Sequence, residues 1–106
     1  MRLALLNTTI ATVDGTFEVK TITTKEAIDL AQSNELLSAI GHESTAQIMT
    51  ELLGVNIPVN RIQFAQETNQ VSLVFKLKGR APEGVILNKQ EIEKIGFEFK
   101  IMTKTK

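Results

Sequence analysis

Short runs in which every second residue is apolar, or in which several apolar residues stand together, indicate β-strands along this chain. The ranges with one of these patterns are 3–6, 17–22, 62–66, 71–77 and 97–101. Four polar residues separate 62–66 from 71–77, so we expect these two strands to pair as a β-hairpin. Within 71–77 the side chains alternate, which places Lys76 on the face opposite the apolar row.

Apolar residues three or four positions apart indicate helices. Thr23 and Glu26 have the spacing of a capping box, in which each side chain bonds the backbone N–H of the other residue. They predict a helix start just before the apolar face at 27–31. Capping-box spacing also opens two of the three other predicted helices, which cover 34–40 up to Gly41, Ser44 to Gly54, and Asn88 to Gly96.

Strand and helix patterns follow one another without a linker, a repeat or a shift in composition. A chain of 106 residues that is 42% hydrophobic is long enough to bury one core. The sequence therefore predicts a single domain over 1–106 of the α/β class, in its mixed α+β form. We expect a mixed sheet of about five strands flanked by short helices.

Charge and composition exclude several kinds of partner. Twelve Lys and Arg residues balance twelve Asp and Glu residues, which argues against binding duplex DNA or a membrane through a broad basic face. With no cysteine and one histidine, we expect no disulfide and no metal site, and without a nucleotide-cofactor motif we expect no cofactor. No apolar stretch reaches the roughly 20 residues of a membrane span, and the start of the chain lacks a signal-peptide pattern. We expect a soluble, cytoplasmic protein.

The single histidine, His42, lies between two predicted helices, after Gly41 and just before the helix that starts at Ser44. A lone histidine in such a place is most often a capping or surface group. The free backbone N–H groups of a helix start, with the hydroxyls of Ser44 and Thr45, also form a cradle for phosphate. A bound phosphate favours imidazolium, which can donate a proton. His42 therefore has both a structural and a catalytic interpretation.

A glycine-bounded loop, GRAPEG, holds a second set of charged groups. Arg80 can present its guanidinium fork to a phosphate, while Glu83, three residues on, holds the fork in place. The alternative is a solvated loop with an incidental ion pair. Likewise Arg61 and Lys76 are ordinary surface charges in the simplest interpretation, and the range 7–9 is a turn after a strand.

Four motifs occur in order: LLNTT, SAIGHESTAQIMTELLG, NRIQF and GRAPEGVILNKQEI. In this order and spacing they resemble the ring nucleases of viruses and mobile elements. Those anti-CRISPR proteins degrade cyclic tetra-adenylate, the second messenger of type III CRISPR defence, and share a small fold first described in an archaeal-virus protein. The resemblance covers nearly the whole chain, and its most specific element is IGHEST leading into a helix that ends L-x-G.

The resemblance implies roles for individual residues. It makes His42 the general acid, with Arg80 and Glu83 as the arginine and glutamate of an active-site loop. It implies ligand contacts for Asn7, Arg61 and Lys76, and we expect Thr8, Thr9, Gly41 and Ser44 to contribute to ligand binding beside them. Where relatives place a serine three residues beyond the asparagine, this chain has Ile10. The hydroxyl would then come from one of the two threonines before it.

The reaction expected from the resemblance needs few groups. In RNA the 2′-hydroxyl lies next to the scissile phosphate, so holding one nucleotide in line for attack removes much of the barrier without a metal. Arg80 would balance the charge on the phosphorane and His42 would protonate the departing 5′-oxygen. The products would be linear di-adenylates with 2′,3′-cyclic phosphates. A two-fold symmetric homodimer with the ligand on its axis would bring two copies of His42 to opposite phosphates.

Two other functions are consistent with the sequence. A protein that binds cyclic oligoadenylate without cleaving it fits the Ile10 departure, because a lost contact can misplace the ligand enough to stop the reaction while binding persists. A structural or regulatory interaction protein of a mobile element is the other, and zero net charge argues against DNA as its partner.

Overall fold

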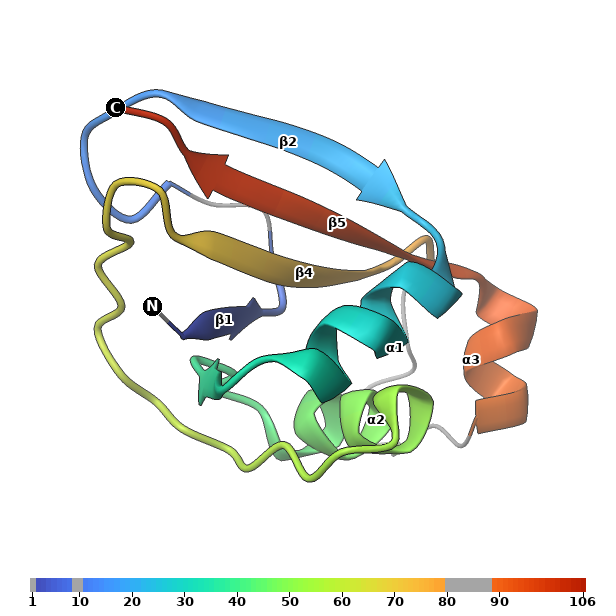
Figure 1. Cartoon of the computed structure of the whole chain (residues 1–106). Coiled ribbons are helices and arrows are strands. Elements are labelled where there is room, and N and C mark those ends of the chain that lie inside the picture. Colours follow the sequence, from blue (N-terminus) through green and yellow to red (C-terminus); the bar gives the residue numbers. More distant parts are fainter. Residues whose placement is uncertain (1, 9–10, 80–88) are drawn as a thin grey trace.

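A computed structural model of the chain describes residues 2–8, 11–79 and 89–106, which form five strands and three helices (Figure 1). In chain order the elements are β1 (Leu3–Leu6), β2 (Phe17–Ile22), α1 (Thr24–Ser33), β3 (Leu36–Ser38), α2 (Glu43–Leu53), β4 (Val71–Leu77), α3 (Lys89–Ile95) and β5 (Phe97–Lys104). No helix in this described part is both long and apolar enough to span a bilayer.

The five strands form one sheet in the order β2-β5-β4-β1-β3. β1 is parallel to both of its neighbours, β3 and β4, whereas β5 is antiparallel to β4 and to β2. The predicted mixed five-stranded sheet is therefore confirmed. Because β1, β3 and β4 run in the same direction, their carboxyl ends meet at one edge of the sheet.

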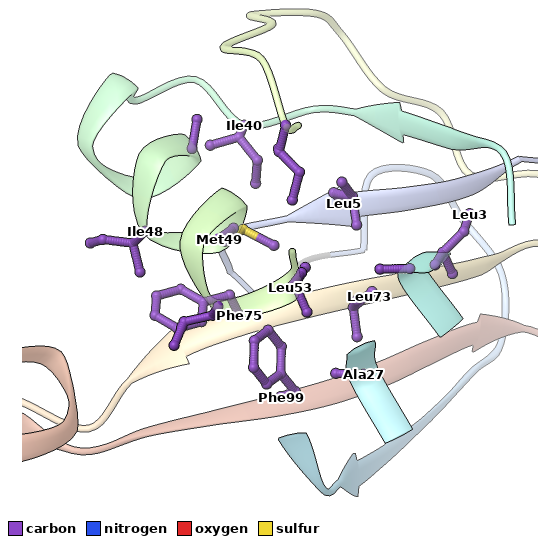
Figure 2. Packing of buried hydrophobic residues seen from close by; sticks show 14 of the residues in the cluster. Leu3, Leu5, Ala27, Ile40, Ile48, Met49, Leu53, Leu73, Phe75 and Phe99 are labelled. Carbon is purple, nitrogen blue, oxygen red and sulfur yellow. The ribbon is translucent and has the colours of Figure 1, made fainter. Parts of the chain in front are cut away.

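All three helices lie over one face of the sheet and bury the main core against it (Figure 1). Side chains of α1 and α2 meet those of the central strands there (Figure 2), and among them are Ala27, Met49, Leu53, Leu5, Leu73, Phe75 and Phe99. The Cα radius of gyration is 13.2 Å, close to the value of about 13 Å for a single domain of 100 residues. One compact α/β domain is the result.

Irregular chain covers part of the opposite face of the sheet. In the segment between α2 and β4, Phe64 packs against a smaller cluster of Leu6, Val74 and Met102. The buried side chain of Gln66 donates to the C=O of Met102 at 2.9 Å and accepts from the Ser72 hydroxyl at 3.0 Å. These side-chain hydrogen bonds hold the segment against this face of the sheet.

Two predicted elements are wrong. The range 34–40 holds strand β3 where we predicted a helix, and the range 62–66 contains no strand. The hydrophobic residues of 34–40 stand at helical spacing, but parallel pairing with the buried strand β1 places this segment in the sheet instead. The hairpin between 62–66 and 71–77 does not form because both edges of β4 are already paired, with β1 and with β5.

The capping box that starts α1 is confirmed. The N–H of Glu26 donates to the Thr23 hydroxyl and the N–H of Thr23 donates to a Glu26 carboxylate oxygen, both at 3.1 Å. Hydrogen bonds from the backbone and then the side chain of Thr23 lower the pKa of Glu26. Because folding lowers this pKa, the ionised carboxylate stabilises the fold at pH values above the pKa of Glu26 in the unfolded chain. This contribution is lost as the pH falls through the pKa of Glu26 in the folded protein.

We predict that Thr23→Ala lowers the free energy of unfolding by about 1 kcal/mol, because one helix N–H loses its acceptor. Urea denaturation at neutral pH would measure the loss. Thr24→Ala is the matched control, since Thr24 is the first residue inside the helix and makes no capping hydrogen bond. Equal stability of the Thr23→Ala variant and the wild type would contradict the role of this cap.

Candidate functional site

The carboxyl ends of the three parallel strands bring together residues from distant parts of the chain. In open α/β sheets, ligands bind at this edge, where the chain leaves adjacent strands in opposite directions. β1 lies between β3 and β4 here. Asn7 directly follows β1, Gly41 and His42 follow β3, and Lys76 is the residue before the last in β4. The candidate site therefore lies at this edge.

His42 is the N-cap residue of α2 by its backbone alone. Its backbone is extended (φ −122, ψ 128), and its C=O accepts from the Ala46 N–H at 3.0 Å. The imidazole makes no capping hydrogen bond and is exposed. The interpretation of the His42 side chain as a cap is therefore wrong, while the imidazole is accessible to a ligand.

The capping box predicted at Ser44 is also wrong, because the N-cap of α2 is His42, two residues earlier, and the helix begins at Glu43. Ser44 lies inside the first turn and is half-buried. The first N–H groups of a helix have no intrahelical acceptor, and the His42 side chain does not cap those of α2. This end of the helix therefore presents donors and a partial positive charge.

Hydrogen bonds join the segment after α2 to the residues that follow β3. The buried Ser38 hydroxyl donates to the C=O of Pro58 at 2.6 Å. The Asn60 side chain donates to the C=O of Ser38, and the Asn60 N–H donates to the C=O of Ile40, both at 2.8 Å. Three bonds over a few residues hold the two segments side by side and bring the next residue to the start of α2.

That next residue, Arg61, lies beside the residue that precedes His42. Its Nε donates to the C=O of Gly41 at 2.7 Å, and its Cγ would lie 3.4 Å from a Cβ at position 41. The side chain is exposed, and no ion pair between described residues involves it. With Nε anchored, the two terminal nitrogens of the guanidinium can bind an anion at the start of α2.

A cleft of about 510 Å³ lies between the first two turns of α2 and the segment 57–61. Its lining residues are Gly41, Glu43, Ala46, Gln47, Ile57, Val59 and Arg61. Another cleft, of about 520 Å³, is lined by Arg2 and Glu35, which precede β1 and β3. It therefore lies at the amino ends of the parallel strands, away from His42, and the first cleft is the one that borders the candidate site.

The structure brings only some of the predicted site residues together. Gly41, Ser44 and Arg61 share the start of α2 with His42. Lys76 is exposed on the sheet face opposite the helices, because its neighbours in β4 point into the main core. The predicted site residues Asn7 and Thr8 follow β1 at the same edge, half-buried and exposed respectively, whereas Thr9, Arg80 and Glu83 lie outside the described residues.

Sequence reasoning missed the residues that position Arg61. Asn60 stands in the NRIQF motif next to Arg61, which is the signal that could have identified it. Ser38 opens the motif SAIGHESTAQIMTELLG, but we predicted its segment as a helix and so missed its role. Among the described residues, no group of three or more His, Asp or Glu side chains is arranged to hold a metal ion.

Comparison with known proteins finds relatives in archaeal viruses and in a bacterium. The sequence profile of the family described as STIV B116-like matches residues 3–99. The uncharacterized protein YddF of Bacillus subtilis (strain 168) is 34% identical over 98% of this chain and 98% of its own length. Uncharacterized protein 26 of Sulfolobus islandicus filamentous virus (isolate Iceland/Hveragerdi) is 39% identical over 79% of this chain and 75% of its own.

A solved structure shows the same fold. B116 of Sulfolobus turreted icosahedral virus superposes with a TM-score of 0.76, covering 97% of this chain and 99% of that chain. The two sequences are 21% identical, so this likeness concerns the fold alone.

We predict that Ser38→Ala lowers the free energy of unfolding by about 1–2 kcal/mol, because a buried hydroxyl that bonds Pro58 is lost. Urea denaturation measures the change. Ser33→Ala is the control, since the Ser33 hydroxyl is exposed and bonds only within α1; its effect should stay within about 0.5 kcal/mol. Equal losses in the two variants would show that the bond to Pro58 does not hold the segment.

Proposed function

Since the chain belongs to the STIV B116-like family and its motifs resemble those of the ring nucleases, we propose that it cleaves cyclic tetra-adenylate. His42 acts as general acid. Arg61 binds the phosphate, and the first turn of α2 supplies backbone donors. By the resemblance, Arg80 and Glu83 complete the site.

The arrangement of an exposed imidazole, an anchored guanidinium and a helix start is the observation that carries this proposal. Arg61 is held by a bond of 2.7 Å to the C=O of Gly41, the residue directly before His42. The N-terminus of α2 adds the positive end of the helix dipole at the same place. All three groups favour a bound anion, and one of them can also give up a proton.

The proposed reaction is an internal transesterification. The ribose 2′-oxygen forms a bond to phosphorus while the bond from phosphorus to the 5′-oxygen breaks. The protonated imidazole of His42 gives its proton to the departing 5′-oxygen, and the proton of the 2′-hydroxyl passes to solvent. Because the nucleophile is part of the substrate, the step uses positioning and charge stabilisation and needs no metal-bound water.

Two copies of the site fit the symmetry of the substrate. A cyclic tetranucleotide carries four phosphates and can adopt two-fold symmetry, so a homodimer would present His42 and Arg61 twice, to opposite sides of the ring. Cleavage at two opposite phosphates yields two linear di-adenylates. Local groups of this kind would bind an anionic ligand although the chain has no net charge.

We predict that the wild-type protein converts cyclic tetra-adenylate to di-adenylates with 2′,3′-cyclic phosphates in the presence of EDTA. His42→Ala should reduce the rate constant about 100- to 10,000-fold, the usual contribution of a general acid, while binding measured by calorimetry persists. Chromatography of the products gives the rates. Asn56→Ala, at an exposed position beyond the C-terminal end of α2, serves as the control.

Three outcomes would count against this assignment. Equal cleavage by wild type and the His42→Ala variant would show that His42 is not the acid. Recovery of intact ring after long incubation with stoichiometric wild-type protein would identify a binding protein without turnover. Failure to bind any cyclic oligoadenylate would favour an interaction protein.

We also predict that Arg61→Ala weakens binding of cyclic tetra-adenylate by about 10- to 100-fold, the loss expected when a charge-assisted hydrogen bond of about 1.5–3 kcal/mol is removed. Lys25→Ala is the matched control, because it removes a positive charge from an exposed position on α1. Titration calorimetry at two salt concentrations would measure both variants. Unchanged affinity of the Arg61→Ala variant would place the phosphate elsewhere.

A further inference from the structure

The cleft beside α2 is lined by polar groups of two kinds. Gly41 directly precedes His42, and Arg61 donates to the Gly41 C=O. On α2 the polar side chains are the Glu43 carboxylate and the Gln47 amide, four residues apart on one face of the helix. The guanidinium suits a phosphate, whereas the carboxylate suits a hydrogen-bond donor.

Apolar side chains line the side of the cleft opposite α2, where Ile57 and Val59 lie. Val59 is 43% exposed, and it is one of three exposed large hydrophobic residues in the described part of the chain. An apolar wall next to a carboxylate and an amide suits a flat ring that has a hydrogen-bonding edge.

The cleft is formed before any ligand arrives, because its two sides are bonded together. The Thr50 hydroxyl donates to the C=O of Ala46 at 2.8 Å, and the N–H of Ile57 donates to the same hydroxyl at 2.9 Å. Position 57 is thereby tied to the second turn of α2. A preformed cleft loses little conformational entropy when a ligand binds.

We propose that this cleft binds one adenine base of the ligand. The Glu43 carboxylate accepts a hydrogen bond from the 6-amino group of the base, and the Gln47 amide forms a hydrogen bond with an adjacent ring nitrogen. The proposal rests on the proposed function, because it assigns a base to the cleft that adjoins the phosphate site. An ionised carboxylate only accepts hydrogen bonds, so Glu43 favours the donor that adenine carries. A purine with a carbonyl oxygen at that position would face a second acceptor, which is why Glu43 would discriminate against it.

The test compares cyclic tetra-adenylate with cyclic tetra-inosinate, in which a carbonyl oxygen replaces the 6-amino group. The wild type should prefer the adenine ring in kcat/KM by about 5- to 150-fold, the factor supplied by one good base contact. Glu43→Gln keeps the size of the side chain and adds a donor, so the preference should fall toward unity. Glu51→Gln makes the same change two turns farther along α2, outside the cleft, and should keep the wild-type preference.

A second variant separates base binding from chemistry. Gln47→Leu removes both hydrogen-bonding groups and keeps the bulk, so it should raise KM for cyclic tetra-adenylate severalfold with kcat nearly unchanged. Equal cleavage of both rings by the wild type, or an unchanged preference in the Glu43→Gln variant, would overturn the assignment of the base while the proposed function stands. If the wild type neither binds nor cleaves either ring, the proposed function fails and the base assignment fails with it.

Discussion

Parallel pairing of β1 with strands on both of its sides is the constraint on which the rest of the structure depends. All four residues of β1 are buried, so both faces of the sheet need cover at this point. The helices supply it on one face, and the segment around Phe64 and Gln66 supplies it on the other. Parallel strands also require long crossovers. One of them contains α2 and brings its N-terminus to the carboxyl edge of the sheet.

The candidate site depends on the path of the segment that follows α2. One short segment, 57–61, bonds to Ser38 and Ile40, places Arg61 against Gly41 and forms the apolar wall of the cleft. The phosphate site and the proposed base site therefore share one support. Net charge has no part in this arrangement, because the attraction for an anion comes from one guanidinium and one helix end at short range.

The local capping signal was correct at the start of α1. Thr23 and Glu26 form the expected capping box because nothing outside this first turn takes part in it. The same signal failed at Ser44, because the start of α2 depends on where the preceding strand, β3, ends. The range 34–40 fits a helix by its spacing, yet its pairing with β1 outweighs that preference. No local signal reports that both edges of β4 are occupied.

The sequence by itself determined the α/β class, four of the five strands, the start of α1, and the presence of His42 and Arg61 as candidate groups. Only the tertiary structure decided that 36–38 is a strand, that irregular chain covers part of the second face, and that Arg61 lies against the residue before His42. The physical reason is the distance along the sequence over which each interaction acts. Hydrophobic periodicity and helix caps act between near neighbours, whereas Arg61 is held by bonds between residues about twenty positions apart, which exist only once β3 has paired with β1.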